Sequence, residues 1–509
     1  MSRYAAIDIG SNSVRMMVAQ SDPGKPVQVL ASDRQVVRLG TSVFREGRLS
    51  NAAVDLACQV LQRMAAEISK HNVLALRAVG TAALRDASNQ KEFLDRAAEI
   101  LGTQVEVISG LEEARLIHLG VQERWPHPKQ RIIIVDVGGG SCEMILAKHG
   151  HFVEAYSKPL GAVRLTELFL KSDPADEREL ARMQRYIQER IEGPMDRWKQ
   201  EPFDRMIATS STAAATVCAV NEVKRSRRDE ADRMAASASK IRTLAGSIAS
   251  MDQAARTKVP GIGPRRAEIV VAGVAVLNEI VQGLRLPRLY YSTAGVRDGI
   301  IADLVRRKVG METARLDTDQ RAVVRAMVRQ YGVSARHVRR VADLASMLFE
   351  GLRSLHAQPV HRGRVLEAAA YLYNIGHFVN EAKHHRHSQY LVTNSDLPGF
   401  DDRERMMIAN LCRYHRKSMP QPAHDAFQAL LPEDRRTVEL MTPLLRIAVA
   451  LDQSQEQRVD QVDSRVLDGS VELRLSSEFD IDIEQWHTSQ VSPVFQQVYG
   501  VPLAVRIKR

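Results

Sequence analysis

Two glycine-rich turns, about 130 residues apart, constrain the fold of this chain more than any other feature. The first reads Asp8-Ile9-Gly10-Ser11-Asn12-Ser13 and the second Asp136-Val137-Gly138-Gly139-Gly140-Ser141, and each follows a short apolar run. A strand that ends in a carboxylate and then turns through glycine and serine offers backbone N–H groups and hydroxyls to a phosphate, while the carboxylate can hold a cation. The duplication therefore predicts two lobes that close on one phosphate chain.

The composition is that of a soluble globular protein without a disulfide framework. At 509 residues, of which 44% are hydrophobic, the chain is too long for one core, so two to four domains are expected. Cys58, Cys142, Cys218 and Cys412 show no CxxC or ligand-like spacing, which argues against disulfides and against a zinc site. Apolar residues begin at Tyr4 without a charged leader, and no apolar run is long enough to cross a bilayer. We therefore expect a cytoplasmic protein with no integral membrane association.

The net charge of +10 predicts attraction to polyanions. Charge alone does not distinguish nucleic acid from anionic lipid or a phosphate polymer, and a basic surface kept for solubility explains it equally well. Aromatic residues make up only 5% of the chain, and the sequence has no helix-turn-helix, zinc-finger or RNP signature. We therefore expect no nucleic-acid partner.

The order of the expected elements indicates an α/β fold with two lobes. Residues 4–20 read as strand, turn and strand, and residues 131–147 repeat this pattern. Further strands alternate with helices after each hairpin, which is typical of a mixed sheet in each lobe. We assign residues 1–130 to the first lobe and residues 131–311 to the second.

The remainder of the chain is expected to form a second class of domain. After about residue 312 the apolar positions recur at helical spacing, which predicts an all-α domain over residues 312–464. The pattern then returns to strand, helix and strand, so residues 465–509 are predicted to form a small α+β unit.

The helix predicted after Ser109 presents two consecutive carboxylates in its first turn. With Ser109 as N-cap, Glu112 falls at the third helical position and completes a capping box, which is a structural role. Glu113 is rotated by roughly 100° around the helix and is free to meet a substrate. The positive end of the helix should favour its ionised form, which suits a base that orients or deprotonates water. Without the flanking loops, Glu113 would more often be a solvated helix residue.

Two further carboxylates and one arginine complete the candidate chemistry. Asp136 precedes the second glycine turn, and Glu143 follows it on the return strand. Mg²⁺ bound to phosphates usually takes one or two protein carboxylates, so Asp136 is the first candidate ligand and Glu143 the second. Arg85, at the head of a predicted helix, suits bidentate contact with phosphate oxygens. Each is a weak signal alone, because an Asp before a glycine turn is common in Asx-turns and a lone Arg is usually a surface residue.

Taken in order, these motifs resemble those of the exopolyphosphatase and guanosine pentaphosphate phosphohydrolase (Ppx/GppA) family. Besides the two glycine turns, the matching segments are residues 80–85, 109–116, 158–164 and 294–299. The resemblance covers most of the chain. It implies two ribonuclease-H-like lobes of the acetate and sugar kinase and actin superfamily, which enclose a cleft.

The resemblance also implies a role for each site residue. Glu113 would be the catalytic base, Arg85 a phosphate contact, and Asp136 and Glu143 the magnesium site. The two turns would be phosphate cradles, formed by Gly10, Ser11, Asn12 and Ser13 and by Gly138, Gly139, Gly140 and Ser141. The implied cofactor is Mg²⁺ or Mn²⁺, with K⁺ as a further candidate cation, and the implied assembly is a homodimer.

The helical region resembles the HD-type phosphohydrolase domain that longer family members carry. Four of its residues stand in the order of that domain: His337, His384, His415 and Asp452. The diagnostic His-Asp pair is replaced by Tyr373 and Asn374, and neither substitutes well as a metal ligand. We expect a non-catalytic HD-like domain.

A basic segment of this region offers a second hypothesis. Residues 361–420 hold nine Lys or Arg against six Asp or Glu, and six of the fifteen histidines. This face, with Arg416 and Lys417, would extend the cleft into a channel for a long polyanion. A solvated helical surface with histidines in the core explains the pattern equally well.

Together these features predict a metal-dependent exopolyphosphatase that removes terminal orthophosphate from inorganic polyphosphate processively. The alternative within the same enzyme class is hydrolysis of guanosine pentaphosphate to the tetraphosphate. Residues 209–213 lack the glycine that family members usually show there, which weakens the guanosine alternative slightly and argues against a kinase. A silent sensor of polyphosphate or an alarmone is a third alternative, which Glu113, Asp136 and Glu143 disfavour.

Overall fold

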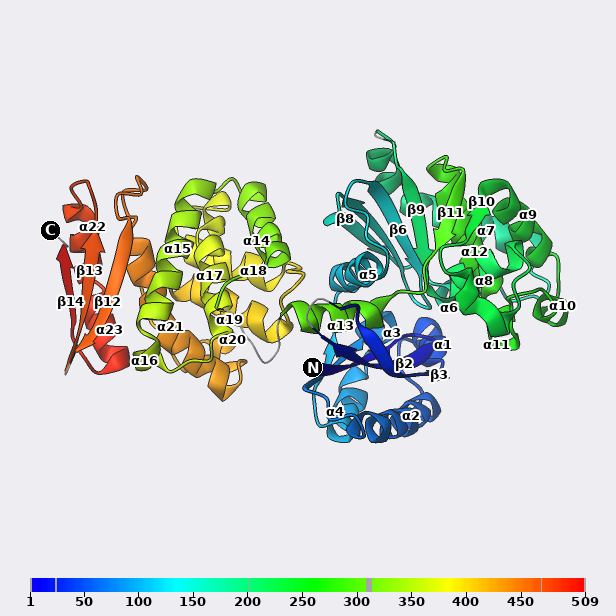
Figure 1. Cartoon of the computed structure of the whole chain (residues 1–509), viewed down its shortest axis with the longest axis horizontal. Coiled ribbons are helices and arrows are strands. Elements are labelled where there is room, and N and C mark those ends of the chain that lie inside the picture. The colour runs from blue at the N-terminus through cyan, green and yellow to red at the C-terminus, as the bar shows by residue number, and fades with distance from the viewer. Residues whose placement is uncertain (1, 23–24, 201, 308–313, 468, 508–509) are drawn as a thin grey trace. The chain divides into compact units, whose positions relative to one another are not determined.

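The chain folds into two compact units, Met1–Val309 and Gly310–Arg509 (Figure 1). The computed structural model describes residues 2–22, 25–200, 202–307, 314–467 and 469–507. The expected boundary between residues 311 and 312 lies outside the described residues. Within the described part, no helix is both long enough and apolar enough to cross a membrane. The four cysteines are buried free thiols.

The first unit begins with a five-stranded sheet in the order β3-β2-β1-β4-β5. Its strands are β1 (Ser2–Ile9), β2 (Ser13–Ser21), β3 (Gln28–Val36), β4 (Ala75–Gly80) and β5 (Val105–Val107). The first three strands pair antiparallel, whereas β4 and β5 join in parallel. Parallel neighbours need crossover connections, and helices supply them here: α1 (Leu39–Glu46), α2 (Asn51–Ser69), α3 (Ala82–Asp86) and α4 (Gln90–Leu101).

The second sheet of this unit repeats the same plan, in the order β10-β11-β9-β6-β7-β8. Its strands are β6 (Arg131–Val137), β7 (Cys142–Lys148), β8 (His151–Lys158), β9 (Arg205–Thr209), β10 (Ala235–Ser237) and β11 (Arg288–Tyr291). Again the first three strands are antiparallel, and the next two, β9 and β11, join in parallel. The duplicated turns of the sequence therefore belong to two sheets of the same topology, and each turn connects the first two strands of its sheet.

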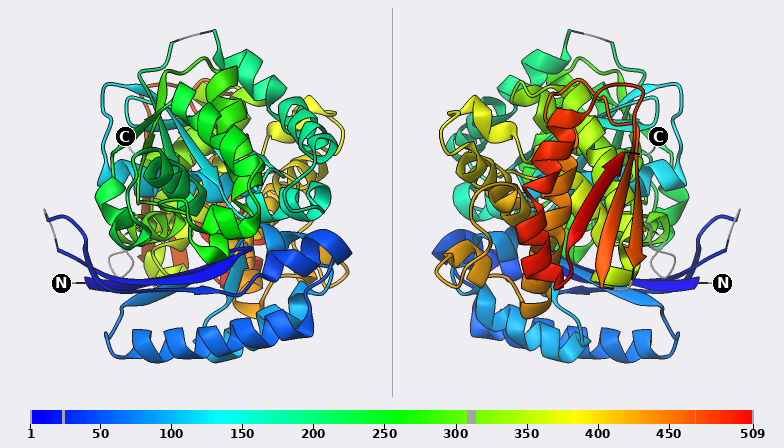
Figure 2. Two further views of the ribbon diagram at one scale, coloured as in Figure 1. Left: turned by 90° about the vertical axis from the view of Figure 1, so that its right-hand side faces the viewer. Right: turned by 90° about the vertical axis from the view of Figure 1, so that its left-hand side faces the viewer.

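Alternating apolar residues give the central strands two buried faces. On β1, Ile7 packs in the same cluster as α2 and α4, whereas Tyr4 and Ala6 face the opposite side. Figures 1 and 2 show α2 and α4 covering the outer face of the first sheet. Ile132 and Ile134 of β6 share a cluster with Tyr4, together with α5 (Gly110–Arg124) and α13 (Val296–Arg306). These two helices therefore form the layer between the sheets.

The outer face of the second sheet is covered by a third layer of helices. Its buried cluster joins the other face of β6 to three helices, α7 (Glu177–Trp198), α8 (Ser210–Val220) and α12 (Val270–Gly283). The remaining short helices of the unit are α6 (Ala162–Phe169), η1 (Arg225–Ala231), α9 (Ala238–Ala249), α10 (Gln253–Thr257) and α11 (Pro264–Ala267).

The second unit is mainly helical and contains one three-stranded sheet. Its helices are α14 (Thr318–Gln330), α15 (Ala335–Gly351), α16 (Arg353–His356), α17 (Arg362–Leu372), η2 (Ile375–Phe378), α18 (His384–Thr393), α19 (Asp402–Tyr414), α20 (Asp425–Gln428), α21 (Pro432–Ala450), α22 (Asp482–Ser489) and α23 (Ser492–Tyr499). The sheet has the order β12-β13-β14, with β12 (Gln461–Leu467), β13 (Ser470–Ser476) and β14 (Leu503–Ile507). One continuous hydrophobic cluster runs from these helices into the sheet.

The structure corrects the sequence analysis at the start of this sheet. The predicted α+β unit began at residue 465, but that position lies inside β12. Of the residues in β12, only Val462 is buried, so the strand lacks the apolar alternation by which a strand is recognised. The strand therefore gives no signal in the sequence, and the sheet begins at Gln461, before residue 465.

Candidate active site

The two glycine turns have the same geometry and lie against each other. Gly10 N donates to Ser13 O at 3.1 Å, and Gly138 N donates to Ser141 O at 3.0 Å. A Cβ atom on Gly140 would lie 2.7 Å from the Oγ of Ser11. A side chain at this position would therefore force the turns apart, which explains the glycine in physical terms.

Residues of both lobes line one cleft where the turns meet. All eight residues of the two predicted cradles line it, together with Glu113 from α5 and Asp136 at the end of β6. Six further polar residues that line the cleft were not among the predicted site residues: Asp8, Arg15, Thr81, Ser210, Ser211 and Arg266. Asp8 had a detectable signal, because it occupies in the first turn the position that Asp136 occupies in the second. Thr81 lies in the matching segment of residues 80–85, and Ser210 and Ser211 lie in residues 209–213, whereas Arg15 and Arg266 show no motif of their own.

Buried carboxyl groups concentrate at this cleft. Burial raises the pKa of Asp136 to about 6, opposed by Arg15 and reinforced by Asp8. Burial also raises the pKa of Asp8, against the lowering effect of Arg15, Arg297 and Arg34. The carboxyl groups thus lie close enough to disfavour one another's ionisation, and a bound cation would relieve this repulsion.

Glu113 lies in the cleft, but its ionisation differs from the expectation. Its carboxylate accepts a hydrogen bond from Arg85 Nη1 at 3.2 Å. Burial raises the pKa of Glu113 to about 7, although Arg85 lowers it, and Asp8 adds to the rise. The positive helix end was expected to favour the ionised form, but desolvation in the buried site outweighs it. A pKa near neutrality suits a general base.

Arg85 contacts the candidate base rather than lining the cleft. Besides Glu113, its Nη1 donates to the backbone oxygen of Ile108 at 2.7 Å. The residues that line the cleft do not include Arg85 or Glu143. The structure thus places Arg85 next to Glu113, where it lowers the pKa of that residue.

Glu143 is fully buried next to the cleft. It lies directly opposite Asp136 in the β6–β7 pair and accepts a hydrogen bond from Ser157 Oγ at 2.8 Å. Burial raises the pKa of Glu143 well above its usual range, and the charges of Glu113 and Asp136 raise it further. Of the two predicted metal ligands, only Asp136 therefore lines the cleft.

The donor set fits a hard divalent cation held jointly by protein and substrate. Among the described residues, no three His, Cys, Asp or Glu side chains form a ready-made metal site. Mg²⁺ does not need one, because one or two carboxylates with phosphate oxygens and water complete its coordination. Asp8 and Asp136 line the cleft and provide such carboxylates.

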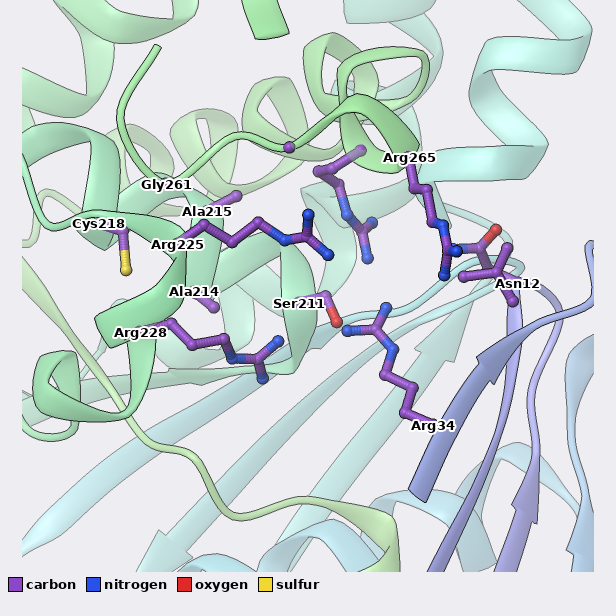
Figure 3. Close-up of a pocket in the computed structure, with 13 residues that line it drawn as sticks. Asn12, Arg34, Ser211, Ala214, Ala215, Cys218, Arg225, Arg228, Gly261 and Arg265 are labelled. Carbon is purple, nitrogen blue, oxygen red and sulfur yellow. The ribbon is translucent and has the colours of Figure 1, made fainter. Parts of the chain in front are cut away.

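A pocket rich in arginine adjoins the cleft and shares Asn12, Ser211 and Arg266 with it. The guanidinium groups of Arg34, Arg225, Arg228 and Arg265 point into one space, as Figure 3 shows. Its remaining lining residues are small or apolar: Val36, Ala214, Ala215, Cys218, Gly261 and Gly263. None of these arginines was predicted from the sequence, because they lie on three separate segments, β3, η1 and α11.

Most of these arginines lack an acidic partner. In the described part of the chain, no carboxylate lies within ion-pair distance of Arg34, Arg225, Arg265 or Arg266, and Arg228 lies 3.8 Å from Asp229. Burial lowers the pKa of Arg34 to about 8, and that of Arg266 to about 10, with neighbouring arginines adding to both effects. This surplus of partly buried positive charge favours a polyanionic ligand.

The segment that departs from the family pattern also contributes to the cleft. Ser210 and Ser211 line it. Ser210 has a φ of 78°, in the left-handed region that favours glycine, and its Oγ donates to Val137 O at 2.9 Å. The backbone turn is therefore formed without a glycine, and it places a serine hydroxyl beside the cleft.

In the second unit, Tyr373 lies among the residues that were compared with HD ligands on the basis of the sequence. His337 Nδ1 donates to Asp452 at 2.7 Å, and the hydroxyl of Tyr373 donates to His337 Nε2 at 2.6 Å. The phenol thus occupies the imidazole nitrogen that a metal would need. The ring nitrogens of His384 and His415 lie 3.3 Å apart, and burial lowers the pKa of both residues.

Arg416 and Lys417 belong to this second unit. The guanidinium of Arg416 lies 3.3 Å from His384 Nδ1, in the same pocket as His337 and Tyr373. Lys417 follows at a positive φ of 60°. Their proposed part in a polyanion channel stays a prediction.

Comparison with known proteins identifies the family. The model of the Ppx/GppA phosphatase family matches residues 17–308, and the model of its domain III matches residues 320–488. A solved Ppx/GppA family member from Aquifex aeolicus is 28% identical, with a TM-score of 0.52, and the match covers 60% of this chain and 98% of that one.

Two further solved structures agree with this match. An exopolyphosphatase-like protein is 26% identical with a TM-score of 0.57, over 60% of this chain and 99% of the other. An exopolyphosphatase from Cytophaga hutchinsonii shares the fold at 22% identity, with a TM-score of 0.55, over 61% of this chain and 99% of that one. With both family models spanning most of its length, the chain belongs to the Ppx/GppA phosphatase family.

Proposed function

We propose that this protein is a metal-dependent exopolyphosphatase that releases terminal orthophosphate from inorganic polyphosphate processively. The observation that carries the proposal is the arginine pocket beside the cleft. A polyphosphate chain bears charge along its whole length, so it can occupy the cleft with its end and the pocket with the following phosphates.

The same pocket argues against a nucleoside as the preferred ligand. A guanine base is usually held by an aromatic or apolar surface together with a few polar groups that read its edge. Arginines and small residues line the pocket, and it contains no aromatic or acidic side chain among the described residues. Hydrolysis of guanosine pentaphosphate is therefore the alternative outcome rather than the first choice.

The chemistry follows from the residues of the cleft. Glu113 would accept a proton from a water molecule that attacks the terminal phosphorus, while the anhydride P–O bond breaks and the shortened chain leaves. The two glycine turns would hold the terminal phosphate oxygens through backbone N–H groups and serine hydroxyls. A divalent cation, held by Asp136 with Asp8 and with Glu143 behind them, would supply charge neutralisation.

The proposal extends to cofactor, location and assembly. Family similarity and the carboxylates of the cleft support Mg²⁺ or Mn²⁺, with K⁺ as a further cation. We also propose a homodimer in the cytoplasm, with the second unit as a non-catalytic HD-like domain. Sedimentation of the purified protein tests the dimer.

One side-by-side assay tests the activity. Phosphate release is measured from long-chain polyphosphate, tripolyphosphate and guanosine pentaphosphate, each with Mg²⁺. The proposal expects kcat/KM for long polyphosphate to exceed that for the nucleotide by about tenfold or more, the effect of one or two lost charged contacts. A preference for the nucleotide would assign the alternative activity, and no release from any substrate would favour a sensor.

A further inference from the structure

A network of buried charges lies directly behind the candidate base. Arg77 donates to Asp303 at 2.8 Å and to Glu112 at 3.2 Å. Arg115 donates to Glu112 through two nitrogens, each at 2.8 Å, and to Asp303 at 2.8 Å. All four residues are buried, with at most 7% of their surface exposed. Two arginines and two carboxylates thus form a closed, fully bonded set.

Two further residues pair with the network, and they carry one positive and one negative charge. Glu106 pairs with Arg77 at 2.8 Å, and Arg307 pairs with Asp303 at 2.7 Å. The whole set therefore holds three cations and three carboxylates. The surrounding cations lower the pKa of Asp303 and of Glu112, so both carboxylates stay ionised although they are buried.

The network ties together three elements that meet at the active site. Arg77 lies on β4 of the first sheet, Glu112 and Arg115 lie on α5, and Asp303 lies on α13. Helix α13 also reaches the first sheet, because Arg297 donates to Met16 O on β2 at 3.0 Å. The first turn of α5 is therefore held from two directions.

The two helices approach each other without intervening side chains. A Cβ atom on Gly299 of α13 would lie 1.8 Å from the backbone oxygen of Leu116 on α5. One on Gly120 of α5 would lie 2.5 Å from the oxygen of Gly295. Backbone therefore packs on backbone along this contact, and the network fixes which turn of α5 faces α13.

Stability alone is a weak explanation for such a network. Ionic groups taken out of water lose hydration, and well-packed apolar residues of similar volume are often as stable. Directional hydrogen bonds, unlike apolar packing, fix the rotation of the helix about its own axis. Glu112 precedes Glu113, so the bonds of Glu112 fix the backbone from which the candidate base projects toward Arg85.

We propose that Glu112 and Arg115 are positioning residues that hold the first turn of α5 so that Glu113 keeps its place between Arg85 and the cleft. This inference rests on the proposed function of Glu113. It differs from the capping role expected of Glu112. Of the two hydrogen bonds in a capping box, the structure shows the one in which Ser109 Oγ accepts from Glu112 N, at 3.2 Å. The Glu112 carboxylate bonds to the two arginines instead.

The test removes a neutral pair, so that no buried charge is left unbalanced. In Glu112→Gln/Arg115→Met, Arg77 and Arg307 still face Glu106 and Asp303. We expect kcat for polyphosphate to fall by about tenfold or more, because small displacements of a reacting group cost rate steeply. KM should stay within about threefold, because the residues that hold the phosphates are unchanged. A role in stability alone would lower the melting temperature and leave kcat of the folded protein intact.

The matched control is an ion pair on other elements of the same unit, between a buried arginine and an exposed aspartate. Arg256 is buried and pairs with Asp173. Asp173→Asn/Arg256→Met should lower the melting temperature and leave kcat within about twofold, as expected for a site remote from the chemistry. A control that loses as much kcat as the test variant would overturn the inference.

The outcomes separate this inference from the proposed function. If the unaltered protein releases phosphate from no substrate, the proposed function fails. If it is active, Glu113→Gln is inactive, and Glu112→Gln/Arg115→Met keeps kcat within about twofold, the positioning role fails. If the double variant does not fold, Arg115→Lys tests the inference instead. Lysine keeps the positive charge but cannot donate to Glu112 through two nitrogens, so kcat should fall while KM stays unchanged.

Discussion

The guanidinium of Arg85 lies 3.2 Å from the carboxylate of Glu113 and opposes the rise in pKa that burial imposes on it. Because a base must be ionised to act, kcat/KM should increase with pH as Glu113 loses its proton, near the pKa of about 7. In Arg85→Met the lowering effect is lost, so the pKa rises and the acidic limb should move to higher pH. A pH profile of kcat/KM measures this shift.

The matched control for Arg85 is Arg96→Met, which removes an arginine whose partner is the exposed Asp55 on α2. Its acidic limb should coincide with that of the unaltered protein. If the limb of Arg85→Met also stays in place, the assignment of Glu113 as the titrating base is wrong.

The arginine pocket should determine affinity for long chains. In Arg34→Gln/Arg228→Gln, KM for long polyphosphate should increase by about tenfold or more, since each charge-assisted contact contributes about 1.5–3 kcal/mol. Under the proposed function, tripolyphosphate would occupy the cleft without filling the pocket, so its KM should change little. Steady-state kinetics with both substrates measure the difference.

The control for the pocket is Arg182→Gln/Arg185→Gln on the exposed face of α7. It removes the same charge and should leave both KM values unchanged. Equal losses in the pocket variant and this control would mean that overall charge, rather than the pocket, attracts polyphosphate.

The stabilisation of the protein by Mg²⁺ should depend on pH. The folded-state pKa values of Asp136 and Glu113 are raised to about 6 and about 7. Such groups contribute stability that is complete below their unfolded pKa, near 4, and is lost as pH rises through the folded pKa. The increase in melting temperature caused by Mg²⁺ should therefore be small at pH 5 and larger at pH 7.5. Thermal unfolding with Mg²⁺ and with a chelator measures it.

Asp136→Asn provides the internal check on this linkage. The variant lacks one of the raised carboxyl groups, so its stability relative to the unaltered protein should improve as pH rises without metal. It should also gain less from Mg²⁺. If Mg²⁺ raises the melting temperature of both proteins equally at pH 7.5, Asp136 is not a metal ligand. The exposed Asp55→Asn serves as the control.

The basic face of the second unit yields a separate prediction. If Arg416 and Lys417 contact the distal part of long chains, Arg416→Ala/Lys417→Ala should weaken binding of long polyphosphate and spare tripolyphosphate. Binding titrations with both chains measure this effect. Equal losses for the two substrates would contradict a channel.

Much of the catalytic unit could be predicted because its signals are local. The turn after β1 and the turn after β6 each carry an aspartate, glycines and serines close together, so both turns and Asp136 could be predicted as site candidates from the sequence. Ser109 likewise marks the start of α5, which places Glu113. These are features of short segments, and the structure brings both cradles, Asp136 and Glu113 to one cleft.

The missed residues depend on tertiary packing. Arg34 on β3 and Arg265 on α11 are far apart in sequence and meet only because the two lobes face each other across the pocket. The partners of Glu112 are similarly remote, since Asp303 lies on the last helix of the unit. The ionisation of Glu113 was also wrong, because the helix end is visible in the sequence whereas the burial that opposes it is not.

The most direct test of the account compares the unaltered protein with Glu113→Gln in phosphate release and in binding of long-chain polyphosphate, with Mg²⁺. The account predicts that turnover falls by about a hundredfold or more, the usual cost of losing a general base, while the dissociation constant stays within about threefold. Turnover that persists within about threefold of the unaltered protein would contradict the account, because no base would then act at Glu113.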